Sequence, residues 1–276
     1  MAKRSSETTI IQPRKGLIPI DFRELFRRRE LLWVLGRRDI KVRYKQTVFG
    51  ILWAILQPFM TMIVFTFFFG NLAKIPSEGV PYALFSYSGL VLWTFFTNAV
   101  NVAGNSMVND AGLISKVYFP RVLIPFASTL LPLLDYVIAL VIVFGIMVHY
   151  HTPLNPQIAF LPVVVFLTWI LVCGIGLWSS AINVKYRDVR YAIPIFLQLM
   201  IFMTPVIYPI SISGRFKWLV TLNPMTGLME AHRACILGHH AIDFRLLGIS
   251  VALTALIFVS GMFYFRSVER FFSDII

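Results

Sequence analysis

Six apolar blocks divide the chain, and polar or charged residues separate each block from the next. The blocks lie near residues 49–70, 82–107, 124–148, 158–182, 193–209 and 246–265. A helix needs about 20 apolar residues to cross the hydrocarbon core of a bilayer, and Gln46 to Ala73 carries no charged residue. The pattern predicts an all-α polytopic membrane protein with six transmembrane helices.

The fifth block is short, and Pro194, Pro205 and Pro209 restrict its backbone. Residues 193–209 are barely long enough to span a bilayer. We therefore expect an irregular helix at this position.

The segment after the fifth block, residues 210–245, is still rich in Leu, Ile, Met and Trp. A solvated loop would be more polar. The pattern predicts two short re-entrant or interfacial helices, near 214–222 and 224–238, broken at Asn223-Pro224. Irregular backbone at membrane depth must be covered by protein or line an aqueous cavity, so this segment is expected to border a pathway as an external gate.

Positive charge sets the orientation. With both termini on the cytoplasmic side, 20 of the 25 Lys and Arg residues lie in cytoplasmic segments and five lie outside. Loops rich in Lys and Arg remain in the cytoplasm. The sequence therefore predicts cytoplasmic amino and carboxyl termini.

Residues 21–45 are predicted to form an amphipathic interfacial helix that precedes the first span. Its apolar stripe comprises Phe22, Phe26, Trp33, Ile40 and Tyr44, and Gly36 is a possible interruption. Such a helix lies with its rings among acyl chains and its cations among anionic headgroups.

Eight positive charges fall between residues 27 and 45. Two interpretations stay open: the helix is only a cytoplasmic anchor, or its arginines bind a phosphorylated lipid through bidentate contacts. The candidates for the second role are Arg27, Arg28, Arg29, Arg37 and Arg38.

Composition agrees with a membrane protein: 58% of residues are hydrophobic, 14% are charged, and the mean hydropathy is +0.75. The net charge of +12 is concentrated beside the first span, so membrane lipids rather than nucleic acid are the expected anionic partner. Residues 1–20 are polar and are expected to be a flexible cytoplasmic terminus without a signal peptide. Residues 46–276 are expected to form one transmembrane domain.

Catalytic and metal-binding patterns are not evident. The sequence lacks G-x-x-x-x-G-K-[ST], so ATP hydrolysis by that motif is not expected, and no metal or cofactor is predicted. Asp135 inside the third span is either a structural partner of a neighbouring helix or a functional group. The histidines are expected to be interfacial or solvated: His149, His151, His232, His239 and His240.

The cytoplasmic connection 109–121 is predicted to be a helix-like turn stopped by Pro120, with exposed aromatic side chains and flanking charges. Such a hydrophobic knob suits a groove on a partner protein. The connection 183–190 is a tight basic turn that can act as a topological anchor.

Several motifs occur in a fixed order: E-L-L-W-V-L-G-R-R-D-I-K-V-R-Y at 30–44, G-I-L-W at 50–53 with Q-P at 57–58, K-V-Y-F-P-R at 116–121, N-V-K-Y-R-D-V-R at 183–190, T-P-V-I-Y-P at 204–209 and L-N-P-M at 222–225. In this order they make the chain resemble the ABC-2 type polysaccharide-export permeases, which secrete O-antigen, capsule or teichoic-acid polymers.

The resemblance implies a homodimer in the bacterial cytoplasmic (inner) membrane, bound to two copies of a separate ABC ATPase subunit that holds ATP and magnesium. It implies a glycan on undecaprenyl diphosphate as substrate. Residues 210–245 then correspond to external gate helices, marked by Asn223 and Pro224. The connection 109–121 corresponds to the helix that couples to the ATPase, with Lys116, Tyr118, Phe119, Pro120 and Arg121 as its candidate residues.

A moving sugar chain needs weak, repeated contacts with aromatic rings and with amide or hydroxyl groups. Residues on one face of the first span and along the fifth are candidates for this path, with ordinary helix packing as the alternative: Trp53, Gln57, Thr61, Phe68, Gln198, Phe202 and Tyr208. Two other functions remain open, an ABC-2 permease for a drug or small lipid and a membrane-embedded transferase.

Overall fold

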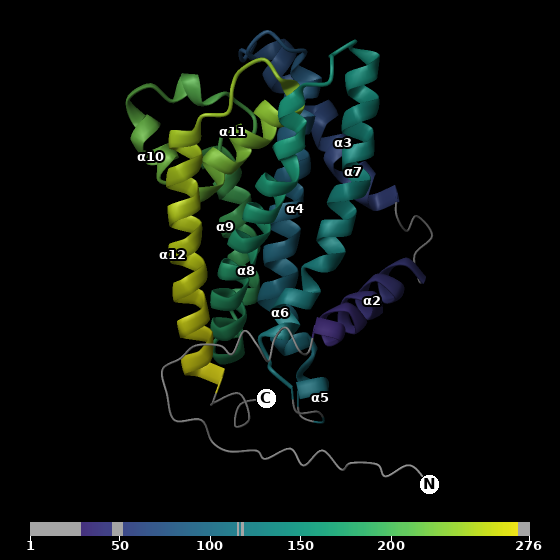
Figure 1. Ribbon diagram of the computed structural model, residues 1–276, viewed down its shortest axis with the longest axis vertical. Helices are drawn as coiled ribbons and strands as arrows, with labels where there is room; N and C mark the ends of the chain where they lie inside the picture. The colour runs from purple at the N-terminus through teal and green to yellow at the C-terminus, as the bar shows by residue number, and fades with distance from the viewer. Residues whose placement is uncertain (1–28, 46–51, 115, 117–118, 270–276) are drawn as a thin grey trace.

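The computed structural model describes residues 29–45, 52–114, 116 and 119–269, and every regular element in these ranges is a helix. The long helices run side by side as a bundle (Figure 1). The elements are α2 (Arg29–Lys45), α3 (Leu52–Phe65), η1 (Thr66–Leu72), α4 (Tyr82–Asn109), α5 (Ala111–Ile114), α6 (Leu123–Ser128), α7 (Leu130–His149), η2 (Pro156–Phe160), α8 (Leu161–Lys185), α9 (Val189–Met203), η3 (Ile210–Phe216), α10 (Lys217–Thr221), α11 (Pro224–Leu237) and α12 (Phe244–Glu269).

Five helical segments of the described chain are long and apolar enough to cross a membrane: Leu52–Leu72, Tyr82–Asn109, Leu123–His149, Pro156–Lys185 and Phe244–Glu269. The all-helical polytopic class is therefore confirmed, with five of the six predicted blocks forming full-length spans. The block expected at 193–209 instead forms α9, which has only 15 residues.

Helix α9 begins four residues earlier than predicted and ends six residues earlier, at Met203. It ends because Thr204 adopts an extended conformation, with φ −104° and ψ 138°, as expected for a residue that precedes a proline. Residues 204–209 are therefore irregular, and the predicted fifth span is shortened to a 15-residue apolar helix.

The two ends of the bundle carry different segments (Figure 1). We call one the basic end; it holds α2, α5, the turn after α8 and the last residues of α12. We call the other the far end; it holds residues 73–81, 204–224 and 238–243 with the short α10. This grouping agrees with the alternation of segments predicted from the apolar blocks.

Helix α4 forms the centre of the bundle. In its most apolar 18-residue stretch, 78% of the residues are buried, against 11% in that of the first span. Helix α4 contacts α3, α6, α7, α8, α9 and α11. Small residues allow this close packing: a Cβ on Gly176 of α8 would lie 2.7 Å from the Cβ of Ala103. Transmembrane helices that lack a water-driven hydrophobic force depend on such close van der Waals contact.

Helices α8 and α12 approach even more closely, backbone to backbone. A Cβ on Gly174 would lie 2.8 Å from the Cα of Phe258, and a Cβ on Gly261 would lie 2.6 Å from the carbonyl oxygen of Gly174. A backbone neighbour cannot rotate away as a side chain can. This crossing therefore requires glycine at both positions.

We expect Gly174→Ala to force α8 and α12 apart and to destabilise the chain by roughly 1–3 kcal/mol, the usual cost of overpacking. The measurement is the melting temperature of the purified protein in detergent. Gly248→Ala in α12 is the matched control, because a Cβ there meets nothing within 4 Å and alanine favours a helix. Equal melting temperatures for the two variants would contradict the packing argument.

Candidate functional site

At the basic end, α2 is fixed to the bundle by its leucine face. Leu31, Leu32 and Leu35 pack against the cluster that contains Phe119 and Phe265. Gly36 is buried, and a Cβ there would lie only 2.6 Å from Cδ1 of Leu130. The helix continues through Gly36, so the suspected interruption is a packing contact.

The predicted aromatic stripe of α2 does not form a single membrane-facing surface. Trp33 is 59% exposed, whereas Tyr44 points inward and its hydroxyl donates a hydrogen bond of 2.5 Å to Asp135. Phe22 and Phe26 lie outside the described residues. Among the described positions, the stripe therefore divides between an exposed indole and a buried polar contact.

Asp135 pairs with α2 from within α7. Its carboxylate accepts the Tyr44 hydroxyl and lies 3.1 Å from Nη1 of Arg43. A carboxylate in a span is costly unless such partners neutralise it. The structural interpretation of Asp135, as a group that bonds a neighbouring helix, is confirmed.

A second ion pair joins α2 to the connection after α4. Arg38 lies 2.9 Å from carboxylate oxygens of both Asp39 and Asp110. The hydrogen bond to Asp110 raises the pKa of Arg38 above its ordinary value. Two carboxylates thus already neutralise this guanidinium.

The arginines proposed for a lipid phosphate now differ from one another. Arg29 and Arg37 are exposed, and the guanidinium of Arg37 lies 5.8 Å from the centre of the Trp33 ring. Arg38 faces the two carboxylates. Arg27 and Arg28 lie outside the described residues. Arg29 and Arg37 are thus the described candidates at the exposed surface of α2, and Arg37 lies next to the exposed indole.

The connection 109–121 differs from its prediction in one important respect. Phe119 is only 7% exposed and belongs to the same buried cluster as Leu123 and Phe265. The expectation of an exposed aromatic knob is therefore wrong for Phe119, because its ring fills the core between α6 and α12. Lys116 is exposed and Pro120 is half-buried, while Tyr118 lies outside the described residues.

Arg121 connects this loop to the last helix. Its Nη1 donates a hydrogen bond of 2.8 Å to the backbone carbonyl of Glu269, at the end of α12. Cations favour helix carboxyl termini, where backbone carbonyls lack partners. Through Asp110 and Arg121, the connection contacts both α2 and α12.

The candidate path residues lie at the surface of the single chain. Trp53, Gln57 and Phe68 are exposed on the first span, and Gln198 and Phe202 are exposed on α9. Thr61 is half-buried and its hydroxyl donates to the Gln57 carbonyl; the half-buried Tyr208 donates to the Phe202 carbonyl. Helices α3 and α9 both contact α4.

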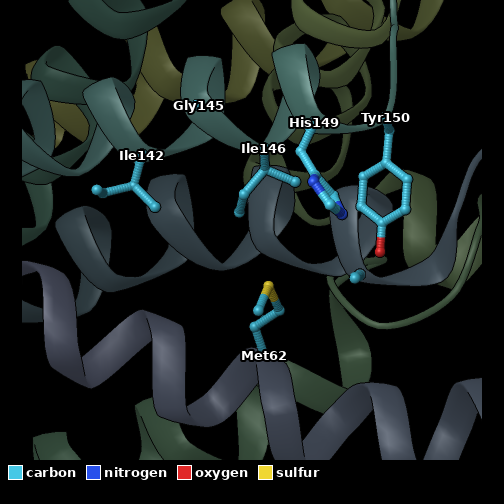
Figure 2. A pocket seen from close by; sticks show the side chains of 7 residues that line it. Met62, Ile142, Gly145, Ile146, His149 and Tyr150 are labelled. Atoms are coloured by element: carbon cyan, nitrogen blue, oxygen red, sulfur yellow. The ribbon is translucent and has the colours of Figure 1, made fainter.

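Two cavities lie next to the first span. One, of about 260 Å³, is lined mainly by apolar side chains, among them Met62, Ile142 and Ile146 (Figure 2). The other, of about 10 Å³, brings Gln57 of the predicted path next to Asp135 and Arg43. The volume of this smaller cavity is about that of one water molecule, so it is not a channel for a polymer.

At the far end, the irregular segment 204–209 is held by side chains. Arg233 of α11, only 1% exposed, donates from Nη1 to the carbonyl of Pro205 at 2.6 Å and from Nη2 to the carbonyl of Val206. The Tyr82 hydroxyl donates to the next carbonyl, that of Ile207, at 2.8 Å. Three successive backbone carbonyls therefore have side-chain donors.

The residues around Arg233 pair with its charge and leave space for its side chain. Its guanidinium lies 3.9 Å from the centre of the Phe85 ring and 3.4 Å from the Glu230 carboxylate. A Cβ on Gly89 would lie 2.7 Å from Nη2 of Arg233, so glycine leaves the space that the guanidinium occupies. A buried arginine requires such pairing and hydrogen bonding.

The predicted helix break at Asn223-Pro224 is confirmed. Helices α10 and α11 lie within the predicted ranges to within a few residues. The Asn223 side chain accepts from the backbone N–H of Met225 at 3.0 Å and donates to the Thr204 hydroxyl at 2.8 Å. These contacts cap α11 and connect it to the end of α9.

His232 differs from its prediction. It is completely buried, and Nε2 lies 2.8 Å from the Tyr136 hydroxyl, so it is neither interfacial nor solvated. Glu230 and Arg233, which were not predicted as functional residues, belong to the same buried helix. Their spacing of three residues on an apolar helix was the available signal, since opposite charges at i and i+3 face one another.

Comparison with known proteins identifies the family. The model of the ABC-2 type transporter family matches residues 30–237, which extend from α2 to the end of α11. The chain belongs to this family. Members of this family are membrane permeases, the transport subunits that lack an ATPase domain. The family assignment therefore excludes the alternative that the chain is a membrane-embedded transferase.

Individual relatives match over nearly their whole length. The O-antigen export system permease protein RfbA of Klebsiella pneumoniae is 25% identical over 90% of this chain and 95% of its own. The RfbA of Myxococcus xanthus is 28% identical over 91% and 97%. The polysialic acid transport protein KpsM of Escherichia coli is 24% identical over 84% and 91%.

The buried Arg233 provides a test of the far end of this ABC-2 permease. We expect Arg233→Met to leave Glu230 and two carbonyls without their donor and to cost about 3–5 kcal/mol, as for other broken buried ion pairs. The readout is the yield of monodisperse protein and its melting temperature. Arg215→Met, at an exposed position of η3, is the matched control and should behave like the wild type. A stable Arg233→Met protein would refute the role assigned to this side chain.

Proposed function

We propose that this ABC-2 permease exports a lipid-linked polysaccharide of the O-antigen, capsule or teichoic-acid type across the bacterial cytoplasmic membrane. The observation that carries the proposal is the match to O-antigen export and polysialic acid transport proteins over 84–91% of the chain. Because these alignments also cover 91–97% of the relatives, the chain has the same extent as proteins whose names specify polysaccharide cargo. A drug or small lipid is the less supported cargo.

The working assembly, on this proposal, is a homodimer with two ABC ATPase subunits that bind ATP and magnesium. The surface of the first span supports a dimer, because only 11% of the residues in its most apolar 18-residue stretch are buried within one chain. The exposed Trp53 and Gln57 on α3 and Phe202 on α9 would line a path only when a second subunit covers them. A polymer path between subunits needs no large cavity within one chain.

The connection 109–121 is the proposed contact with the ATPase. Asp110 pairs with Arg38 on α2, and Arg121 hydrogen-bonds the end of α12. A displacement of this connection by ATP-driven closure of the partner would therefore move α2 and α12 together. Lys116 is the exposed cation available to the partner, whereas the buried Phe119 keeps the connection packed against the core.

Substrate binding would begin at α2. A lipid diphosphate carries several negative charges, and a guanidinium binds phosphate oxygens bidentately. Arg37 is exposed beside the Trp33 ring, so one residue pair offers a cation for the diphosphate and an apolar ring for the lipid. Arg38 has the less favourable position, because binding phosphate would require it to leave two carboxylates.

Purification from native membranes in a mild detergent tests the assembly and its cargo directly. We expect a stoichiometric ATPase with a Walker A motif, two permease chains in each particle, and a bound lipid-linked glycan. Mass spectrometry of the companions and sugar analysis of the lipid extract are the measurements. An ATPase with a drug or simple phospholipid in place of the glycan would refute polysaccharide export, and a protein without any ATPase would refute the two-component transporter.

The proposed glycan path is tested by the double variant Trp53→Ala and Phe202→Ala. We expect export to fall by roughly two- to tenfold for each ring, if each contributes as much as an aromatic pair. Tyr208 is left intact because its hydroxyl holds the Phe202 carbonyl. The matched control is Phe166→Ala, which removes an aromatic side chain that is 55% exposed on α8, away from the path. Wild-type export by the double variant, at equal membrane levels, would remove these rings from the path.

A further inference from the structure

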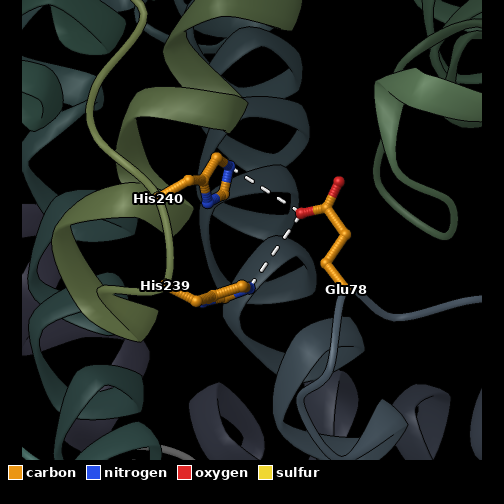
Figure 3. Close-up of side chains that lie close together, drawn as sticks. All are labelled: Glu78, His239 and His240. Carbon is orange, nitrogen blue, oxygen red and sulfur yellow. Dashed lines mark ion pairs between the residues drawn. The ribbon is translucent and has the colours of Figure 1, made fainter.

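Three potential metal ligands meet at the far end of the bundle from distant parts of the sequence. Glu78 lies in the connection before α4, and His239 and His240 lie in the connection between α11 and α12 (Figure 3). A carboxylate oxygen and one ring nitrogen from each histidine all lie within 4.8 Å of one another. Nothing in the sequence relates Glu78 to residues 239–240, so no metal site was expected from it.

The three side chains point at one another across a short gap. Oε2 of Glu78 lies 4.0 Å from Nε2 of His239 and 3.7 Å from Nε2 of His240. These distances are too long for hydrogen bonds. Two nitrogen or oxygen ligands of a tetrahedral Zn²⁺, each about 2.0–2.2 Å from the metal, lie about 3.3 Å apart. The Glu78–His239 and Glu78–His240 pairs would have to close by about 0.7 and 0.4 Å to reach that separation.

Both connections contain residues with positive φ at or next to the three potential ligands. Glu78 and Gly79 have positive φ values of 56° and 83°, and the Ser77 hydroxyl donates to the Val80 carbonyl at 2.5 Å. Gly238 ends α11 in the left-handed conformation, with φ 70°. A positive φ is uncommon for glutamate, so the tight turn at Glu78 is a conformation that the surrounding structure must enforce.

One further acidic group lies near the three side chains. Glu230 of α11 places Oε2 3.8 Å from Nε2 of His240 while pairing with Arg233. Glu230 therefore borders the cluster on the side of His240, outside the three ligand atoms that all lie within 4.8 Å of one another.

We propose that Glu78, His239 and His240 form a Zn²⁺ site that joins the α3–α4 connection to the α11–α12 connection. Two imidazoles and a carboxylate are a characteristic ligand set for Zn²⁺, which has no electronic preference for one geometry. The fourth position is taken by water. The site does not depend on which substrate the permease transports.

The test is titration of the full-length protein with ZnCl₂. The chain is purified in detergent without a polyhistidine tag, freed of metal with EDTA and followed by calorimetry. We expect one tightly bound Zn²⁺ for each chain and, with Co²⁺ in its place, the visible absorption of a four-coordinate ion. The two cysteines are buried, so they do not compete for metal.

Three single variants assign the ligands: Glu78→Gln, His239→Asn and His240→Asn. Each should weaken Zn²⁺ binding by at least about tenfold, the lower bound even for second-shell changes. His151→Asn is the matched control: His151 is exposed and has a φ of 53°, a conformation that asparagine tolerates. Its affinity should equal that of the wild type.

Melting temperatures separate a metal site from a cluster of ion pairs. A ligand that binds only the folded protein stabilises it, so Zn²⁺ should raise the melting temperature of the wild type and of His151→Asn but not of the three variants. Melting in EDTA checks that each variant is folded. The proposal is overturned if the wild type binds no stoichiometric Zn²⁺, or if the three variants bind it as tightly as the wild type does.

Discussion

The backbone carbonyls that follow α9 impose the constraint on which the far half of the molecule depends. A helix that ends within an apolar bundle exposes carbonyls for which lipid offers no donor. Arg233 and Tyr82 supply the donors for residues 205–207. Because Arg233 belongs to α11 and Tyr82 to α4, the short α9, the buried α11 and the central α4 are stable only together. Gly89 leaves space for the guanidinium of Arg233, and the Phe85 ring packs against it.

Charge is used differently at the basic end. There the ionic contacts join helices rather than satisfy a broken backbone: Arg38 with Asp110, Arg43 with Asp135, and Arg121 with the carbonyl of Glu269. These contacts connect α2, α7 and α12. The side chains of Arg38 and Arg43 are partly exposed, whereas Asp135 is buried. In the proposed function this end transmits displacement, whereas at the far end the side chains supply donors to irregular backbone.

The two peripheral elements, α3 and α9, contact α4 with one face and present other apolar and aromatic side chains outward. In a single chain this surface would contact lipid. In an assembly with a second subunit, the same surface would enclose a path whose walls are rings and amides. The distribution of burial, dense around α4 and sparse on α3, therefore suits a subunit that completes its site by association.

Local pattern in the sequence was sufficient for the helical class, the five long spans, the separation of loops into two groups and the helix break at Asn223-Pro224. Each of these depends on residues close together in the chain: apolar run length, the lysine and arginine content of the loops, and the capping chemistry of an Asn-Pro pair. Only the tertiary structure decided that Phe119 and His232 are buried and that Glu78 meets His239 and His240. These features depend on partners that lie up to about 160 residues away, and whether a side chain is buried or paired is determined by the elements packed around it, which a periodicity in one segment does not specify.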